Sequence, residues 1–307
     1  MNHPSKTVLI GGGTGLIGNR LSVLLRDKGY QVLHLSRQAN PSATFPAFAW
    51  NPAQGTIDEN AVQQADYVIN LAGAGIADKP WTAARKQLII ESRVQSTRLL
   101  LQTFQKTGKQ PLAFISSAAM GIYGDTGDRE VVESDPSGTG FLAESCMAWE
   151  QAINEVTAAG IRTVGLRISI VLSTQGGALA KLLLPIRFHA GAYFGDGQQW
   201  YSWIHLDDVS RMFVFAIEND HLTGYYNASA PNPVRNKDFT QQIVRAMRKL
   251  AVIAPAPAFA LRAAMGEMAD VILNSNRLRA DRITQSGFQF DFPELDGALR
   301  DLIARKI

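Results

Sequence analysis

One glycine-rich segment has the spacing of a phosphate-binding turn. Gly12, Gly15 and Gly18 form GxxGxxG within "GGGTGLIG", after the apolar run "TVLI" and before leucines at helical spacing. Such a turn lets the backbone approach a pyrophosphate, and the helix that follows points its free N–H groups at that anion. We therefore predict a dinucleotide site here, with Leu16 and Ile17 beside the phosphates; a merely tight strand-to-helix turn is the alternative.

The end of the next apolar run indicates which dinucleotide would bind. Ser36 and Arg37 follow the run at 31–35, near the distance of ~20 residues at which an NAD enzyme carries an Asp or Glu for the ribose 2′-hydroxyl. No acid is present there, and a hydroxyl followed by a guanidinium suits a 2′-phosphate through charge-assisted hydrogen bonds. We therefore predict NADP(H) as the cofactor; a solvated surface arginine is the alternative interpretation of Arg37.

The single cysteine of the chain lies in "FLAESCMAWE" at 141–150 and raises the question of a nucleophile. No His or Lys lies within one helical turn of Cys146 in sequence to stabilise a thiolate. Cys146 also shares a helical face with Leu142, Trp149, Ile153 and Val156. We therefore predict that Cys146 packs toward a core as a small apolar residue.

Apolar runs of strand length alternate with segments of helical periodicity through the first half of the chain. Strands are predicted at 7–10, 31–35, 67–71, 112–116 and 163–167, and helices from Leu16 to Lys28-Gly29, at 83–106, at 141–159 and from a cap at Asp207-Asp208 to about Glu218. This rhythm predicts an α/β fold, a Rossmann-type doubly wound parallel sheet. We expect the core in 1–172 and 204–230, and a smaller C-terminal, substrate-side region in 173–203 and 231–307.

Several motifs together resemble a known family. "VLIGGGTGLIG", "NLAG" at 70–73, "FISSAAMGIYGD" at 114–125 and "WIHLDDV" at 203–209 resemble an extended short-chain dehydrogenase/reductase of the NAD-dependent epimerase/dehydratase type. "SRV" at 92–94, "GDGQQWYSWIHLDDV" and "GFQFDFPEL" are similar to YfcH-like epimerase-family proteins, some labelled cell-division inhibitors.

The resemblance implies roles for residues at matching positions. Leu71, Ala72 and Gly73 would pass under the adenosine side of the cofactor. Ser116 and Ser117 would stand at the end of strand five, where the family places a Ser or Thr that holds the reacting oxygen of the substrate. Arg93 replaces an Asn that faces the cofactor and would reach its phosphates, or it is a surface helix residue. We assign Ser116 and Arg93 to the cofactor and Ser117 to catalysis.

The helix after strand five departs from the family pattern. Family enzymes carry Tyr-x-x-x-Lys there, in which Lys lowers the pKa of Tyr so that Tyr acts as acid and base. Alignment on Glu150 puts Leu142 at the Tyr place and Cys146 at the Lys place, and a shift by one residue does not restore the pair. Ser117, a water molecule or Tyr123 would then have to move the proton; the alternative for Tyr123 is a structural role.

We predict NADP(H)-dependent redox chemistry on a small sugar-like or carbonyl substrate, in an atypical epimerase/dehydratase-type protein. The alternative is a non-catalytic NADP(H)-binding sensor or regulatory protein, for which the lost Tyr-x-x-x-Lys pair is the chief argument. The residues expected to line the substrate crevice are Lys181, Gln199, Trp200 and His205, with Tyr193 and Trp203. For His205, ordering the start of the helix at 207 is the alternative. The substrate, the reaction type and the oligomeric state stay open.

Composition excludes other classes of partner. The 307 residues include 30 basic and 27 acidic side chains in interspersed order, which gives a formal charge of +3 and argues against nucleic acid. No stretch approaches the roughly 18 apolar residues of a membrane span, and the first residues do not resemble a signal peptide, so we expect a cytoplasmic protein without a membrane partner. The histidines at 3, 34, 189, 205 and 221 lack metal-ligand spacing, so no metal is predicted.

Overall fold

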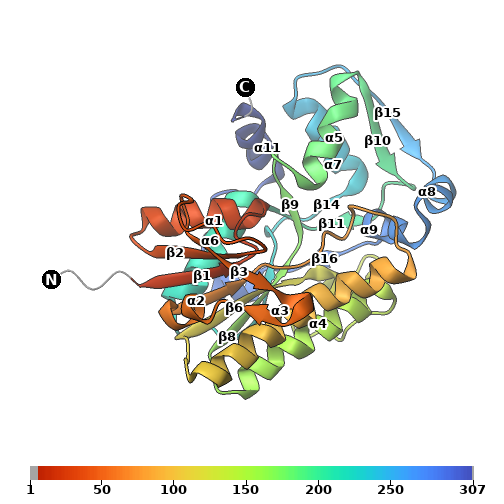
Figure 1. Ribbon diagram of the computed structural model, residues 1–307. Helices are drawn as coiled ribbons and strands as arrows, with labels where there is room; N and C mark the ends of the chain where they lie inside the picture. Colours follow the sequence, from red (N-terminus) through yellow and green to blue (C-terminus); the bar gives the residue numbers. More distant parts are fainter. Residues whose placement is uncertain (1–5, 306–307) are drawn as a thin grey trace.

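The computed structural model describes residues 6–305 and contains one eight-stranded sheet (Figure 1). Its strands, in spatial order, are β13 (Gly224–Ala228), β8 (Thr163–Ile168), β6 (Ala113–Ala119), β5 (Tyr67–Asn70), β1 (Thr7–Gly11), β2 (Gln31–Ser36), β3 (Ala47–Asn51) and β4 (Thr56–Ile57). Neighbouring strands are parallel except β3 and β4. The predicted doubly wound parallel sheet is therefore confirmed.

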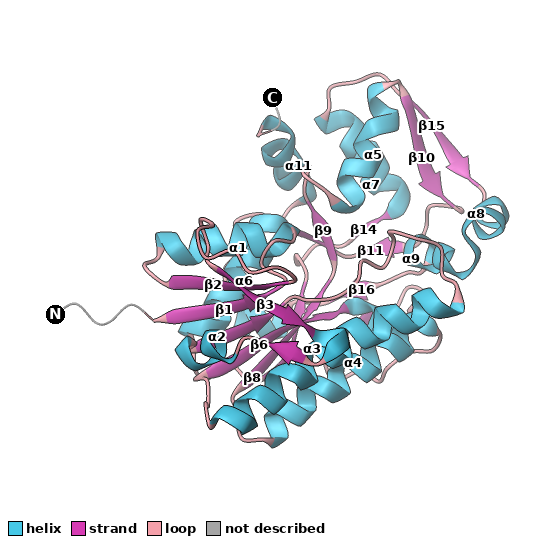
Figure 2. Cartoon of the chain, viewed as in Figure 1, coloured by secondary structure: helices cyan, strands magenta, loops and turns pink. Residues whose placement is uncertain are grey.

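Helices cover both faces of the sheet (Figures 1 and 2). One face carries α1 (Leu16–Asp27) and α6 (Leu206–Glu218), and the other carries α2 (Glu59–Gln64), α3 (Ala83–Thr107) and α4 (Phe141–Ala158). Val8 and Ile10 of β1 pack into the core beneath α1 and α6, whereas Leu9 packs into the core on the α3 side. This burial on both faces explains why the strand is continuously apolar. Among residues 6–305, no helix is both long and apolar enough to cross a bilayer.

The strand order reverses between β1 and β5. From β1 the chain proceeds outward through β2 and β3, and from β5 it proceeds in the other direction through β6, β8 and β13. Gly11 and Asn70, the last residues of these two neighbouring strands, lie opposite each other. Ligands of open α/β sheets bind beyond the carboxyl ends of the strands at such a reversal, because the following loops diverge there.

A second group of elements lies beyond this edge of the sheet, in the upper right of Figure 1. They are β9 (Ile170–Leu172), α5 (Gly177–Arg187), β10 (Ala190–Phe194), β11 (Trp200–Tyr201), β12 (Trp203–His205), β14 (Val234–Arg235), α7 (Asn236–Ala246), β15 (Val252–Ala256), α8 (Ala258–Met265), the 3-10 helix η3 (Gly266–Ala269), α9 (Asp270–Leu273), β16 (Arg277–Leu278) and α11 (Leu295–Ala304). The remaining elements are η1 (Pro52–Gln54), η2 (Met120–Tyr123), β7 (Glu130–Val131) and α10 (Asp281–Gln285), which packs beside β13. A separate hydrophobic core around Trp203, Phe239 and Leu299 holds α5, α7 and α11 together.

Candidate functional site

The turn between β1 and α1 has the geometry that its glycines predict. Gly12 has φ +79°, a left-handed conformation. Its backbone lies close to Leu71, because a Cβ on Gly12 would be 2.9 Å from the Leu71 carbonyl carbon. The N–H of Gly15 donates to the carbonyl of Gly12 at 3.0 Å. A Cβ on Gly18 would lie 2.5 Å from the Gly12 carbonyl oxygen, so only glycine lets α1 begin this close to the turn.

The first turn of α1 is left free to meet an anion. Its N-cap residue, Gly15, has no capping side chain, and no acidic residue occurs in the first turn. The first N–H groups of a helix have no intrahelical acceptor, and the helix dipole makes this end positive. The turn therefore fits a phosphate group through its backbone alone.

His34 supports the turn, and sequence reasoning missed it. A Cβ on Gly13 would lie 2.4 Å from the His34 ring, and His34 Nε2 lies 2.7 Å from the hydroxyl oxygen of Ser22. Burial lowers the pKa of His34, so the ring is neutral at neutral pH. The sequence offers one signal for His34: side chains of a strand alternate between the two faces of the sheet, so its position in β2 could have indicated that it faces α1.

A cleft of about 450 Å³ adjoins the turn at the end of β2. It is lined by Thr14, Asn19, His34, Ser36, Gln38, Ala39, Asn40, Ala43, Thr44, Phe45 and Ala47. No carboxylate is among them, and Arg37 is an exposed residue between two of the lining residues. Ser36 and Arg37 are thus brought beside a polar cleft without negative charge.

Arg93 approaches the loop after β5 from helix α3. A Cβ on Gly73 would lie 3.0 Å from Arg93 Cζ, so the guanidinium lies against this loop. Arg93 Nη1 donates to the Ile89 carbonyl at 2.8 Å, and its Cζ lies 5.0 Å from the centre of the Trp149 ring. Burial lowers the pKa of Arg93, and no carboxylate among the described residues forms an ion pair with it. Arg93 is therefore a largely buried cation without a counter-charge, beside Leu71, Ala72 and Gly73.

Ser116 and Ser117 end up on opposite faces of β6. The Ser117 hydroxyl donates to the carbonyl of Asn70 on β5 at 3.1 Å, and the Ser116 hydroxyl donates to the carbonyl of Ser117 at 2.9 Å. Both side chains are buried. Ser117 is thus held at the carboxyl end of the sheet, next to the loop that carries Leu71–Gly73.

Tyr123, expected as a candidate for proton transfer, lies in a buried hydrogen-bond network. Its hydroxyl donates to Asn227 Oδ1 at 2.7 Å and accepts from Arg167 Nη1 at 2.9 Å. Arg167 in turn binds Glu150 through both carboxylate oxygens. Burial raises the pKa of Tyr123 to about 12. Because both hydrogen-bonding directions are occupied and the proton is tightly held, the geometry supports the structural alternative.

Cys146 is buried on α4, as its helical face predicts. Burial raises the pKa of its thiol to about 12, so the reactive thiolate is disfavoured. A Cβ on Gly121 would lie 3.3 Å from Cys146 Sγ and 3.5 Å from Leu142 Cβ, which places both residues against the segment that follows β6. Helix α4 contains neither Tyr nor Lys.

The residues expected to line a substrate crevice have different surroundings. Lys181 is exposed, and its Nζ donates across to the Ala77 carbonyl at 3.4 Å. Gln199 is buried and donates to the carbonyls of Phe194 and Ile272. Trp203 is buried in the second core and donates to the Asn232 carbonyl, and the Tyr193 ring faces Lys237.

His205 is the N-cap of α6, so the predicted cap at Asp207-Asp208 is wrong. Its Nδ1 accepts from the Asp207 N–H at 3.0 Å, and its Nε2 lies 3.2 Å from Asp301 Oδ2. The ring is fully buried and stacks on Phe292 at 3.9 Å between centres. With both nitrogens engaged, His205 orders the helix start, which is the alternative that the sequence left open.

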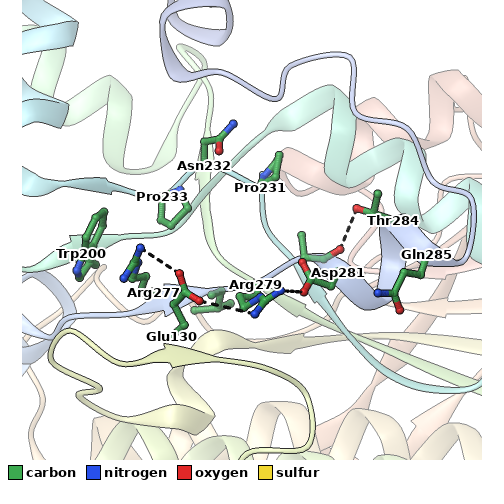
Figure 3. Close-up of a pocket in the computed structure, with 12 residues that line it drawn as sticks. Glu130, Trp200, Pro231, Asn232, Pro233, Arg277, Arg279, Asp281, Thr284 and Gln285 are labelled. Carbon is green, nitrogen blue, oxygen red and sulfur yellow. Dashed lines mark hydrogen bonds and ion pairs between the residues drawn. The ribbon is translucent and has the colours of Figure 1, made fainter.

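Trp200 lies at a separate groove of about 670 Å³ (Figure 3). Glu130 contacts Arg277 at 3.0 Å and Arg279 at 3.8 Å on its floor. The Trp200 ring centre lies 4.1 Å from the Arg235 guanidinium and 4.4 Å from that of Arg277. This groove shares no lining residue with the cleft at β2, and its charges are paired internally.

Metal-ligating side chains are not clustered in the part of the chain that the structure describes: no group of three His, Cys, Asp or Glu residues there could hold an ion. His3 lies outside the described residues.

The chain is similar over most of its length to curated proteins of bacteria. Residues 256–302 match a domain of unknown function, DUF1731. Epimerase family protein Mb2239 of Mycobacterium bovis is 38% identical over 293 residues, which cover 95% of this chain and 96% of that protein. Epimerase family protein YfhF of Bacillus subtilis is 36% identical over 296 residues, with 95% and 96% covered.

A solved structure shows the same arrangement. Human epimerase family protein SDR39U1, crystallised with NADPH, is 30% identical and superposes with a TM-score of 0.86 over 97% of this chain and 99% of that chain. Residues 8–228 match the family described as NAD dependent epimerase/dehydratase. This range includes the glycine turn and every strand of the large sheet except part of β1. The chain therefore belongs to the NAD dependent epimerase/dehydratase family.

Proposed function

We propose that this protein binds NADP(H) and uses it in redox chemistry on a small carbonyl or sugar-like substrate. The observation that carries the proposal is the glycine turn with its uncapped helix, continued by a cleft that contains Ser36, adjoins Arg37 and holds no carboxylate. A 2′-phosphate would be repelled by the acid that NAD enzymes place there and is attracted by a guanidinium. The human relative crystallised with NADPH supports the same assignment.

The residues that would hold the cofactor occupy one continuous edge of the sheet. The turn at Gly12–Gly18 would take the diphosphate, Ser36 and Arg37 the 2′-phosphate, and Arg93 a further negative charge beside Gly73. When bound, the reduced nicotinamide would supply a hydride and the oxidised form would accept one. Ser117, at the end of β6, is the hydroxyl of the chain that we assign to the reacting oxygen. A site with this single hydroxyl would be slow, because a positioned acid or base typically contributes about 10²- to 10⁴-fold.

One observation favours a second candidate, a non-catalytic NADP(H)-binding sensor. Helix α4 offers Leu142 and Cys146 where the family carries its acid-base pair, and the pKa values of Cys146 and Tyr123 are both raised to about 12. Neither group exchanges protons readily near neutral pH. The protein would then bind the dinucleotide and change its interactions without turnover.

A paired binding and turnover experiment separates the two. The protein is titrated with NADPH by fluorescence and then incubated with NADPH and a panel of aldehydes, ketones and nucleotide sugars while the absorbance of the reduced nicotinamide is followed. Gly18→Ala, whose Cβ would strike the Gly12 carbonyl, should abolish binding, and Gly297→Ala, with open space around its Cβ, is the control. For the enzyme, Ser117→Ala should lower turnover about 10²-fold while NADPH still binds.

The control for Ser117 is Ser210→Ala, a buried hydroxyl on α6 that donates to its own helix. Tight NADPH binding without turnover across the panel would favour the sensor. No NADPH binding by the unchanged protein would contradict both functions.

A further inference from the structure

Large apolar side chains are exposed mainly on one part of the molecule. Of the eight such side chains recorded as exposed among residues 6–305, five lie between 184 and 259. Four of these surround two neighbouring turns, with exposed fractions of 57% for Leu184, 76% for Phe188, 89% for Leu250 and 77% for Val252. Exposure of this degree in a cluster, rather than singly, indicates a surface that contacts something else.

The same surface is positively charged. No Asp or Glu occurs at 177–195 or at 239–266. Arg187, Arg248 and Lys249 are exposed there, and none of the three forms an ion pair with any described residue. We call the surface formed by Leu184, Arg187, Phe188, Arg248, Lys249, Leu250 and Val252 the basic apolar tip.

Backbone contacts bring the two turns of the tip together. The Val252 N–H donates to the His189 carbonyl at 3.0 Å, and the His189 ring contacts the Leu250 carbonyl, where β10 and β15 begin to pair. His189 and Arg248 have φ of 62° and 52° and are the residues other than glycine in 6–305 with positive φ. Such conformations are costly and are kept where a surrounding fold fixes them. In Figure 1 these turns lie at the top of the molecule, away from the large sheet.

We propose that the basic apolar tip docks onto a membrane surface that carries anionic lipids. Unpaired cations are attracted to the negative surface potential, and the apolar side chains between them enter the boundary between headgroups and acyl chains. The charge argues against a second copy of this chain, because two such tips would bring like charges together. The expectation of no membrane partner rested on the absence of an apolar spanning stretch and on the average charge of the chain. Neither property reveals that the fold brings Arg187 close to Arg248 and Lys249.

The cofactor site stays accessible in this orientation. Helix α5 begins beside the glycine turn, where a Cβ on Gly177 would lie 3.9 Å from Leu16 Cδ2, and ends at Arg187 in the tip. Its 11 residues span about 16 Å at 1.5 Å per residue, more than the ~5–10 Å to which peripheral apolar groups enter a bilayer. Docking would therefore hold the protein at the surface with the dinucleotide turn above it.

The test is co-sedimentation of the full chain with vesicles. Vesicles of phosphatidylcholine alone are compared with equal mixtures of phosphatidylcholine and phosphatidylglycerol, at low and high salt. We expect binding to the mixed vesicles that weakens with salt. Arg248→Ala with Lys249→Ala should lower the partition coefficient about five-fold per charge, or about 25-fold together. Phe188→Ser with Leu250→Ser should lower it roughly ten-fold or more.

The matched control is Leu112→Ser with Lys109→Ala, which changes an exposed leucine and a lysine just before β6. It should bind vesicles within about two-fold of the unchanged protein. NADPH titration and thermal melting check that each variant folds. Equal binding of tip variants and control, or no binding of the unchanged protein to either vesicle, would overturn the proposal. Self-association that Leu250→Ser abolishes, seen by light scattering, would overturn it in favour of a second copy.

Discussion

At the scale of single residues, environment decides what a side chain can do here. Tyr123 has the phenol that proton transfer requires, but Asn227 and Arg167 occupy it and burial raises its pKa to about 12. Arg37 is the opposite case, because it is exposed and adjoins a cleft without carboxylates. The first residue is therefore fixed in a structural role, and the second is free to meet a ligand.

Arg37→Glu should reverse the cofactor preference. The change replaces a cation that would bind the 2′-phosphate with the acid that suits a ribose 2′-hydroxyl. A charge-assisted hydrogen bond contributes about 1.5–3 kcal/mol, so we expect the ratio of NADP(H) to NAD(H) affinity to fall about ten- to hundred-fold. Fluorescence titration with both dinucleotides measures it, with Lys109→Glu as a charge-matched control. An unchanged ratio of NADP(H) to NAD(H) affinity would mean that Arg37 is a solvated surface arginine.

At the scale of elements, a buried ion pair joins α4 to the sheet. Glu150 of α4 receives two hydrogen bonds from Arg167 of β8 at 2.8 and 2.9 Å, and both residues are buried. Arg167 also reaches Tyr123 of η2, whose hydroxyl bonds Asn227 of β13. This network joins the helix, the segment after β6 and the edge strand of the sheet.

Glu150→Ala should therefore be strongly destabilising. It leaves the Arg167 guanidinium buried without its counter-charge, which costs about 3–5 kcal/mol of unfolding free energy. Glu155→Ala on the same helix removes a partly exposed partner of Arg98 and should cost about 0.2–1 kcal/mol. Chemical denaturation of the two variants gives the comparison. Equal losses would mean that the buried pair contributes no more than a surface pair.

The start of α6 should make stability depend on pH. Burial lowers the pKa of His205 below its ordinary 6.5, so the folded protein keeps this ring neutral where the unfolded chain binds a proton. Stability is then fully present above about pH 6.5 and falls as the pH decreases below it, by at most about 1.4 kcal/mol per pH unit for one proton. In addition, a proton on Nδ1 would remove the acceptor for the Asp207 N–H.

His205→Asn keeps a capping side chain without a titrating group. Its unfolding free energy, measured by denaturation between pH 5 and 8, should fall less steeply below about pH 6.5 than that of the unchanged protein. His221→Asn, at an exposed position, should leave the profile unchanged. Parallel profiles for His205→Asn and the unchanged protein would rule out this origin of the pH dependence.

At the scale of the whole molecule, α6 connects the Rossmann sheet to the end of the chain. Asp208 is fully buried and accepts the N–H groups of Asp291 and Phe292 at 3.0 and 2.9 Å. Asp207 binds Arg20 of α1 and Arg305 near the C-terminus. The "WIHLDDV" and "GFQFDFPEL" motifs, whose contacting residues Asp208 and Asp291 lie 83 positions apart, are thus two halves of one contact.

Asp208→Ala should loosen the C-terminal segment. It leaves two N–H groups without an acceptor, each at about 1–3 kcal/mol, and removes one of the two carboxylate partners of Arg211, which keeps Asp291. We expect a lower unfolding free energy and faster proteolysis within 277–305. Asp296→Ala, which breaks only an exposed pair with Arg300, is the control. Unchanged protease resistance would show that α11 is held by its core contacts alone.

The sequence by itself determined the sheet and the glycine turn. Strand positions and the packing of Cys146 followed from periodicity, since burial on both sheet faces selects continuous apolar strands and helical faces repeat locally. The left-handed conformation of Gly12 and the close packing of Gly18 on the turn followed from the glycine spacing, because a side chain at either position would be strained or would clash. These features depend on neighbours within about one βαβ unit.

Only the tertiary structure decided which distant residues meet. Three features do not follow from local sequence: the contact of His34 with the glycine turn, the network around Tyr123 and the cap formed by His205. Each depends on partners from other elements. The surroundings of Gln199 and Trp200 also depend on other elements, because Gln199 donates to the Ile272 carbonyl and the Trp200 ring lies over Arg235 and Arg277. Arg187 and the pair Arg248-Lys249, about sixty residues apart in the chain, came together only when β10 and β15 paired, as three-dimensional proximity rather than sequence order sets the local charge.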